Sequence, residues 1–227
     1  MTSGTAAQAW ISWAAPLEDA AESAYLSTAE RGQVATKRRH EDRVRSASAR
    51  LILKAVLKGQ FGIDPAGVEL VASSRAAKPV LHVGGAPSRL RANISHAGDV
   101  VMVAVTEGID VGVDVEHEEA TAFPDFDAVA LSDAERAALH ALPRERWPGT
   151  RAGYWVRKEA LVKATGTGLS VDPRTICFES PGPVMPPSIV RLELGRGYAA
   201  ALCIPGASCI DLRHVAVDLN LPPRERP

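Results

Sequence analysis

The chain has 227 residues, of which 46% are hydrophobic and 23% charged, with a formal net charge of −1. These values are typical of a globular protein with one large domain or two small ones. The near-zero net charge gives no reason to expect nucleic acid or an anionic membrane as a partner, and no apolar run reaches the roughly 20 residues of a membrane helix. The N-terminus lacks the features of a secretory signal. We therefore expect a cytoplasmic protein with no nucleic-acid or membrane partner.

A basic segment, Lys37–Lys58, is the first stretch with a chemical signature. On a helix, Arg43, Arg50 and Lys54 recur at helical spacings and share one side. Such a side is often only a solvated face, but arginine also binds phosphate through two hydrogen bonds. The segment has no aromatic residue before Phe61, which disfavours recognition of stacked bases. A small phosphorylated ligand fits better, and Lys78, in a short loop, adds another cation.

Ser95 and His96 come just before a predicted strand, Gly98–Val105. Histidine beside serine binds a phosphate oxygen in some sites and forms an ordinary polar pair at a strand edge in others. We reject serine hydrolysis, because adjacent residues in an extended segment point apart. The segment around Ser95 also lacks the glycine-flanked nucleophile turn of hydrolases.

The segment Ile109–Glu116 alternates strictly between apolar and polar residues, which predicts a half-buried strand. Asp114 and Glu116 project from the same face, with roughly 6.5–7 Å between their Cα atoms. Two carboxylates at this separation suit a hard divalent cation such as Mg²⁺, although a solvated strand face is the ordinary alternative. Gly112 permits close approach of another backbone.

The segment Trp155–Lys163 predicts a helix that ends at the glycines after Thr165. Glu159 and Lys163 lie four residues apart and therefore share one face, with Lys158 beside them. Glu before Lys at this spacing also stabilises an ordinary surface helix. Glu159 could nevertheless supply a third carboxylate to Asp114 and Glu116, and a metal site beside lysines indicates phosphate chemistry.

The chain also contains a weak internal sequence repeat, whose two copies lie roughly one domain length apart. Ser27 and Glu30 form a capping box, a motif that satisfies the free amides at a helix start, and Ser132 and Glu135 form another. Four further weak matches follow in the same order. They pair 53–55 with 162–164, 63–65 with 171–173, 98–105 with 197–204 and 112–115 with 216–219. Together they indicate a duplicated unit, with strands beside segregated helices and hence an α+β fold.

Three segments resemble the signatures of Sfp-type 4′-phosphopantetheinyl transferases. They are V-G-V-D-V-E at Val111–Glu116, W-V-R-K-E-A-L-V-K-A-T-G-T-G-L at Trp155–Leu169, and N-I-S-H at Asn93–His96. The resemblance implies an α+β fold of two similar halves related by a pseudo-twofold axis. Each half would hold a small antiparallel sheet packed with helices, and the active site would lie in the cleft between them. We expect subdomains at residues 1–107 and 108–227.

The implied reaction moves 4′-phosphopantetheine from coenzyme A to a serine of an apo acyl or peptidyl carrier protein, and releases adenosine 3′,5′-bisphosphate. By motif, the Mg²⁺ ligands would be Asp114, Glu116 and Glu159. Lys158 and Lys163 would lie near the phosphates, and Ser95 and His96 near the adenosine 3′-phosphate. Arg45 and Lys78 match the family's nucleotide-phosphate cations, and Arg50 is an added candidate.

Glu159, Lys163 and Asp114 are the residues to which we assign catalytic roles. Glu159 is our candidate for the base that removes the carrier serine's proton, with Asp114 or a metal-bound water as alternatives. Lys163 and Arg45 would stabilise the anionic leaving group. A monomer is favoured, because an internal duplication removes the need for a symmetric partner.

Two other functions compete with transfer. One is a coenzyme A- or nucleotide-binding module that has lost catalysis. The other is a metal-dependent phosphohydrolase, although a two-metal centre would need more carboxylates or histidines than these three acids. The sequence does not identify the carrier protein.

Overall fold

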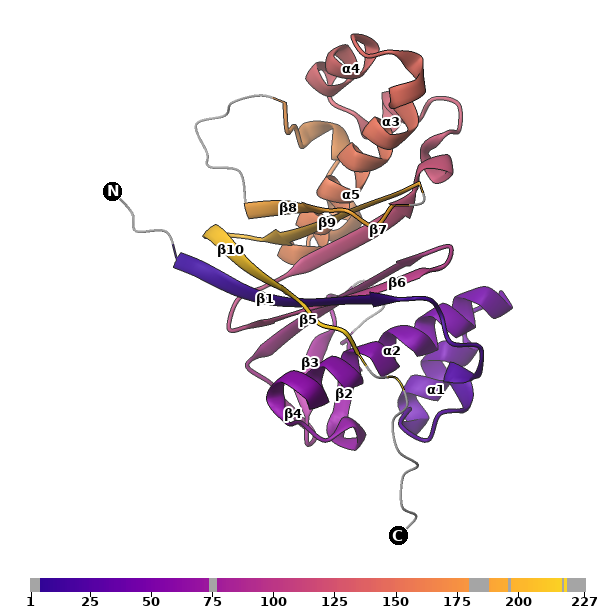
Figure 1. Ribbon diagram of the computed structural model, residues 1–227, viewed down its shortest axis with the longest axis vertical. Coiled ribbons are helices and arrows are strands. Elements are labelled where there is room, and N and C mark those ends of the chain that lie inside the picture. Colours follow the sequence, from indigo (N-terminus) through magenta and orange to yellow (C-terminus); the bar gives the residue numbers. More distant parts are fainter. Residues whose placement is uncertain (1–4, 74–76, 180–187, 196, 218, 220–227) are drawn as a thin grey trace. The chain divides into compact units, whose positions relative to one another are not determined.

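The computed structural model describes residues 5–73, 77–179, 188–195, 197–217 and 219, and it divides into two compact units (Figure 1). Unit 1 comprises residues 1–7 and 109–211, and unit 2 comprises residues 8–108 and 212–227. The division after residue 108 lies one residue beyond the predicted boundary. The chain ends differ from the prediction, since the residues from 212 onward group with the N-terminal half. The N–H group of Val215, for example, donates to the carbonyl of Ile11 at 2.7 Å.

The described residues of unit 2 form two α-helices, a small sheet and most of a four-stranded sheet. The four-stranded sheet has the order β10-β1-β6-β5, where β1 is Thr5–Ala14, β5 is Leu90–Ala97, β6 is Val100–Glu107 and β10 is Ala207–His214. Residues 5–7 of β1 and 207–211 of β10 are assigned to unit 1. The small sheet has the order β2-β3-β4, with β2 at Val68–Val71, β3 at Val80–Val83 and β4 at Ala86–Pro87. The helices are α1 (Thr28–Ala35) and α2 (His40–Phe61). Short 3₁₀ turns lie at Glu18–Glu22 and Pro65–Gly67.

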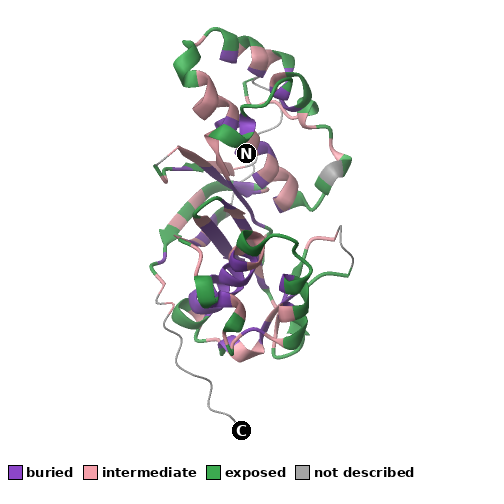
Figure 2. Ribbon diagram, turned by 90° about the vertical axis from the view of Figure 1, so that its right-hand side faces the viewer, coloured by how far each residue is buried: buried purple, intermediate pink, exposed green. Residues whose placement is uncertain are grey.

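The core of unit 2 forms where α2 packs on the sheet. Leu53 and Leu57, one helical turn apart, contact the apolar residues of β6 in one buried cluster. Helix α2 ends at Gly62, whose φ of 65° is the left-handed conformation that glycine adopts readily. Buried residues concentrate on the strands and on the helices packed against them (Figure 2).

Unit 1 has a three-stranded antiparallel sheet in the order β7-β9-β8. The strands are β7 (Gly112–His117), β8 (Ser188–Leu192) and β9 (Tyr198–Ile204). The α-helices are α3 (Phe126–Ala130), α4 (Asp133–His140) and α5 (Trp147–Thr165). Four 3₁₀ turns lie at Glu118–Thr121 (η3), Arg144–Arg146 (η4), Gly168–Ser170 (η5) and Pro173–Thr175 (η6). The mixed composition and antiparallel sheets of both units confirm the predicted α+β class.

Helix α5 packs on this sheet through small side chains. Ala160 and Ala164 face Ala201 and Cys203 of β9 in one buried cluster. A Cβ atom at Gly112 would lie 2.0 Å from the carbonyl oxygen of Ala160, so only glycine allows β7 to approach the helix this closely. The close approach expected from the sequence is therefore confirmed.

The two units repeat one arrangement of elements. Both predicted capping boxes are present, at Ser27 with Glu30 and at Ser132 with Glu135, and each opens a short helix before the long one. The strand orders β1-β6-β5 and β7-β9-β8 correspond. The predicted match of 112–115 with 216–219 falls partly on residue 218, which lies outside the described residues. Residues 216 and 217 follow the last strand, β10, and form no strand, unlike β7.

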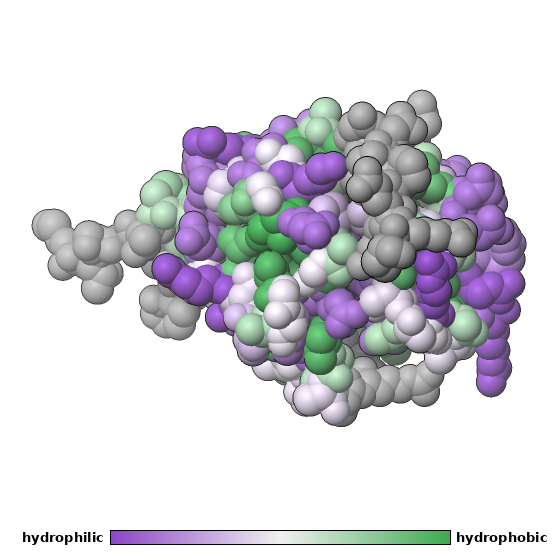
Figure 3. Space-filling model, turned by 90° about the horizontal axis from the view of Figure 1, so that it is seen from below, coloured by the Kyte–Doolittle hydropathy of each residue, from purple (hydrophilic) through white to green (hydrophobic). Residues whose placement is uncertain are grey.

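Figure 3 shows one face on which hydrophobic residues gather among hydrophilic ones. The large hydrophobic side chains exposed in the described chain are Val71, Val80, Phe123 and Val129. Among the described residues, no helix combines the length and apolar character needed to cross a membrane.

Candidate active site

Strand β7 directs Asp114 and Glu116 toward helix α5. In the antiparallel ladder Asp114 is opposite Ala201 and Glu116 is opposite Ala199, and paired residues share a face of the sheet. Both alanines pack in the cluster beneath α5, so the two carboxylates lie on the helix-covered face. Asp114 is buried and Glu116 half-buried.

Helix α5 brings Glu159 and Lys163 to the same place. The Nζ atom of Lys163 lies 2.6 Å from Oδ1 of Asp114 and also donates to the carbonyl of Val113 at 3.3 Å. Glu159, one helical turn before Lys163, is half-buried. The contact between Lys163 and Asp114 therefore joins helix α5 to strand β7, although the two residues are 49 positions apart in the chain.

Burial and neighbouring acids disfavour the charged forms of Glu116 and Glu159. Burial raises the pKa of Glu159, and the negative charges of Asp114 and Glu116 raise it further, whereas Lys163 acts in the opposite direction. Burial also raises the pKa of Glu116, with a smaller contribution from the charge of Asp114. A divalent cation bound here would favour the charged forms of these carboxylates.

This donor set fits a hard divalent cation in its chemistry, since carboxylate oxygens are the protein ligands that Mg²⁺ prefers. Within the described parts of the chain, no three His, Cys, Asp or Glu side chains are already gathered as a metal-binding group. Asp114 and Glu116 nevertheless share one face of β7, and Lys163, one turn after Glu159, contacts Asp114. The metal set predicted from the sequence stays a prediction.

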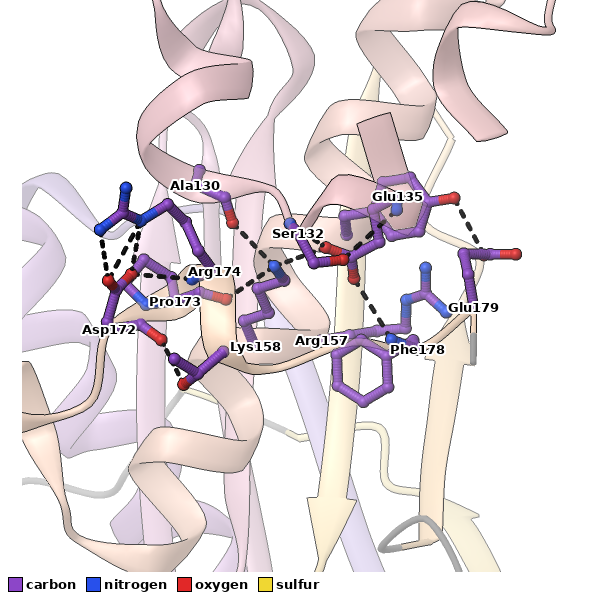
Figure 4. A network of polar contacts seen from close by, with 12 residues as sticks. Ala130, Ser132, Glu135, Arg157, Lys158, Asp172, Pro173, Arg174, Phe178 and Glu179 are labelled. Atoms are coloured by element: carbon purple, nitrogen blue, oxygen red, sulfur yellow. Dashed lines mark hydrogen bonds and ion pairs between the residues drawn. The ribbon is translucent and has the colours of Figure 1, made fainter. Parts of the chain in front are cut away.

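Lys158 lies elsewhere than expected. Its side chain is 1% exposed, and its Nζ atom forms an ion pair of 2.6 Å with Glu135, which is also fully buried. The same ammonium donates to the carbonyls of Ala130 at 2.7 Å and Pro173 at 2.8 Å (Figure 4). Lysine has three donors, and these three acceptors enclose the ammonium. This enclosure is incompatible with the predicted contact between Lys158 and a phosphate.

Arg45 and His96, both predicted to bind the nucleotide, lie near one another in unit 2. Arg45 donates to Oδ1 of Asp42 at 2.7 Å and to the carbonyl of Gly98, in the turn after His96, at 3.3 Å. The hydrogen bond from Arg45 holds the pKa of Asp42 below its ordinary value, and the charge of His96 contributes in the same direction. Asp42 orients Arg45 and was missed in the sequence, where its only signal is the spacing of three residues on a helix.

The other residues predicted to bind the nucleotide are Arg50, Lys78 and Ser95, and they differ in burial. Arg50 is buried and donates to Ser46 and to Gln33, so its guanidinium is held by protein partners rather than presented to a phosphate. Burial lowers its pKa. Lys78 is half-buried, whereas Ser95 is buried on β5. Arg50 therefore leaves the set of predicted ligands, and the roles of Lys78 and Ser95 stay predictions.

A cavity of about 500 Å³ opens elsewhere in unit 1. It lies beside the first half of α5, and Arg157, Glu179, Arg191 and Tyr198 are among its lining residues. None of the predicted metal ligands lines it. The hydroxyl of Tyr154, at the cavity wall, donates to Glu179 at 2.9 Å. This cavity is therefore distinct from the acidic group around Asp114.

Comparison with known proteins accounts for both units. A family model described as the 4′-phosphopantetheinyl transferase superfamily matches residues 110–201, and one described as 4′-phosphopantetheinyl transferase, N-terminal, matches residues 9–108. The two matches follow one another and leave unmatched only residue 109 and the ends of the chain. The chain belongs to this superfamily.

A curated member of the superfamily shows the same relationship. The 4′-phosphopantetheinyl transferase HetI of Nostoc sp. (strain PCC 7120 / SAG 25.82 / UTEX 2576) is 34% identical over 133 residues. The match covers 57% of this chain and 55% of that relative, so the chain spans about half the length of the curated relative it matches. The family resemblance inferred from the signature segments is thus confirmed.

Proposed function

We propose that the chain transfers the 4′-phosphopantetheine group of coenzyme A to a serine hydroxyl of an apo acyl or peptidyl carrier protein. The serine oxygen bonds to the phosphorus that bears the pantetheine, and the diphosphate bond of coenzyme A breaks. Adenosine 3′,5′-bisphosphate leaves with the electron pair, and the serine proton passes to a base. The proposal is carried by the grouping of Asp114, Glu116, Glu159 and Lys163 in a chain that belongs to this superfamily.

We propose Mg²⁺ as the cation that Asp114, Glu116 and Glu159 hold. Bound there, it would supply Lewis-acid stabilisation of the diphosphate. The raised pKa values of Glu116 and Glu159 support this assignment, since burial and neighbouring acids disfavour their charged forms in the absence of a cation. They also imply that cation binding weakens on acidification at a higher pH than ordinary carboxylates would allow.

The other side chains have separate proposed roles. Lys163, already paired with Asp114, donates to the phosphate oxygens and stabilises the leaving group. Arg45, oriented by Asp42, and His96 bind the nucleotide phosphates, with Lys78 and Ser95 as further contacts. Glu159 is our candidate for the base, because a raised pKa makes a carboxylate a better proton acceptor near neutral pH.

We also propose that the protein is cytoplasmic and monomeric. The absence of a membrane-spanning helix among the described residues supports a cytoplasmic location. The repeated arrangement of elements supports a monomer, because one chain already supplies both copies of the unit.

Replacing Asp114 tests the proposed activity directly. Asp114→Ala should abolish the mass gain of an apo-carrier incubated with coenzyme A and Mg²⁺, as measured by intact-protein mass spectrometry. Glu119→Ala is the matched control, since this acid follows β7 and its side chain is 90% exposed. We expect the control to transfer at the wild-type rate. Transfer by Asp114→Ala at the wild-type rate would refute the metal assignment.

Ligand binding tests the cofactor and separates the alternatives. Thermal stability of the wild type should rise when coenzyme A and Mg²⁺ are added together, because ligands that bind the folded state stabilise it. A binding module without catalysis would show this stabilisation but no carrier modification, and a phosphohydrolase would cleave coenzyme A without a carrier. No response to either ligand would contradict the proposal.

A further inference from the structure

The buried ion pair between Lys158 and Glu135 is the centre of a polar network in unit 1 (Figure 4). Besides Lys158, Glu135 accepts hydrogen bonds from the backbone N–H groups of Ser132 at 3.0 Å and Phe178 at 3.3 Å. The network joins the start of α4, helix α5 and the η6 turn, because Lys158 also donates to Pro173. A buried network in which every donor has an acceptor holds its elements in one geometry.

Unit 2 contains a second copy of this network. Lys54 of α2 forms an ion pair of 3.2 Å with Glu30, and both side chains are buried. Lys54 also donates to the carbonyls of Pro65, at 3.1 Å, and Val68. Glu30 accepts from the backbone of Ser27 at 2.9 Å, as Glu135 does from Ser132. In each unit a lysine of the long helix thus binds the capping-box glutamate and the carbonyl of a proline in a 3₁₀ turn.

The second copy corrects the predicted alignment of the repeats. The match of 53–55 with 162–164 paired Lys54 with Lys163, whereas their contacts pair Lys54 with Lys158. Lys54 and Lys158 both meet a buried glutamate and a proline carbonyl, but Lys163 meets Asp114. The two lysines of the signature segment therefore have different physical roles.

The copies differ at the next residue of the helix. Lys54 is followed by Ala55, whereas Lys158 is followed by Glu159, which lies one helical turn before Lys163, the residue that contacts Asp114. Helix α5 packs on the sheet through Ala160 and Ala164, and the close approach of Gly112 sets its distance from β7. The ion pair of Lys158 with Glu135 adds a polar contact to this packing at the residue next to Glu159.

We infer that Lys158 is a positioning residue: its ion pair with Glu135 sets the placement of α5 and so directs Glu159 toward Asp114 and Glu116. This inference rests on the metal site of the proposed function. In this role Lys158 touches neither the metal ion nor coenzyme A, because its ammonium group is paired with Glu135. Lys54 and Glu30 provide the same anchor in unit 2, where no acid depends on it.

Three variants of the full chain test this role: Lys158→Met, Glu135→Gln and, as the matched control, Lys54→Met. For each, Mg²⁺ binding without coenzyme A is measured by calorimetry, and kcat and the KM for coenzyme A are measured at saturating Mg²⁺. Lys158→Met and Glu135→Gln should weaken Mg²⁺ binding and lower kcat by about tenfold, with the KM for coenzyme A within about twofold of wild type. Lys54→Met should lower the melting temperature but leave Mg²⁺ binding unchanged.

The opposite pattern would overturn the inference. If Lys158 binds a phosphate, Lys158→Met raises the KM for coenzyme A by about tenfold or more and Glu135→Gln does not. If Lys158→Met or Glu135→Gln folds and binds Mg²⁺ as the wild type does, the network has only a structural role and the inference is wrong. Glu135→Gln keeps the shape of the side chain, so it decides the question even if Lys158→Met does not fold. Wild-type turnover reports on the proposed function separately, because Mg²⁺ binding does not require transfer.

Discussion

At the scale of single residues, the charge of Glu159 destabilises the folded protein when no cation is bound. Its carboxylate has a raised pKa because it is half-buried beside Asp114 and Glu116, so its charge is disfavoured in the folded protein. A group whose folded pKa lies above its unfolded value stabilises the fold at low pH. That contribution is lost as the pH rises through the folded pKa. Near neutral pH, Glu159 therefore destabilises the protein unless a cation is bound.

Replacing this carboxylate should stabilise the metal-free protein. In chelator at about pH 7.5, Glu159→Gln should raise the free energy of unfolding by about 0.5–1 kcal/mol, after allowance for solvent screening. This corresponds to a rise of about 1–4 °C in Tm. The difference from wild type should shrink toward about pH 4, where both side chains are uncharged. Thermal unfolding followed by circular dichroism measures both effects, and a lower Tm for the variant at neutral pH would count against the repulsion inferred here.

At the scale of elements, the distance between β7 and α5 depends on Gly112. A methyl group at this position would meet the backbone of Ala160 at 2.0 Å, and backbone cannot move aside as a flexible side chain can. The helix would have to move away from the strand, carrying Glu159 and Lys163 away from Asp114. The same glycine therefore determines both the packing of unit 1 and the geometry of the acidic group.

Gly112→Ala should consequently impair stability and transfer together. We expect a loss of about 1–3 kcal/mol in the free energy of unfolding, as for overpacked cores, and a fall in the transfer rate at temperatures where the variant remains folded. Gly153→Ala is the matched control, because nothing lies within 4 Å of its added Cβ atom and it lies within α5. Alanine should stabilise that helix by up to about 1 kcal/mol. Wild-type stability and turnover in Gly112→Ala would show that the helix tolerates displacement.

At the scale of the whole molecule, the two units are not simple halves of the sequence. Val215 lies near the C-terminus but belongs to the core of unit 2, together with residues of α2 and β6. Its backbone N–H donates to the carbonyl of Ile11 in β1, so the residue after the last strand joins the same unit as residues 8–14 of the first. The C-terminal segment is therefore part of the N-terminal unit's hydrophobic core.

Val215→Ala should reduce the stability of unit 2 selectively. Removing buried methyl groups costs about 1–3 kcal/mol, and each unit has its own core. Amides of α2 and β6 should exchange hydrogen faster in the variant, whereas those of α5 and β7 should retain their protection. Cys209→Ser, an exposed position on β10, is the control and should leave both sets unchanged. Equal loss of protection in both sets would contradict the division into units.

The sequence determined the elements whose signals are local: the alternation of β7, the two capping boxes and the glycine stop at Gly166 after α5. It also identified the superfamily, because the signature segments lie close together in the chain. Only the tertiary structure showed that Lys158 is enclosed by Glu135 whereas Lys163 reaches Asp114. Both lysines lie on one helix with acids nearby in the sequence. Their different surroundings arise from partners far away in the chain: Glu135 lies 23 positions before Lys158, and Asp114 lies 49 positions before Lys163. Helical spacing describes the face of a helix, but burial and partner choice depend on which distant elements pack against it.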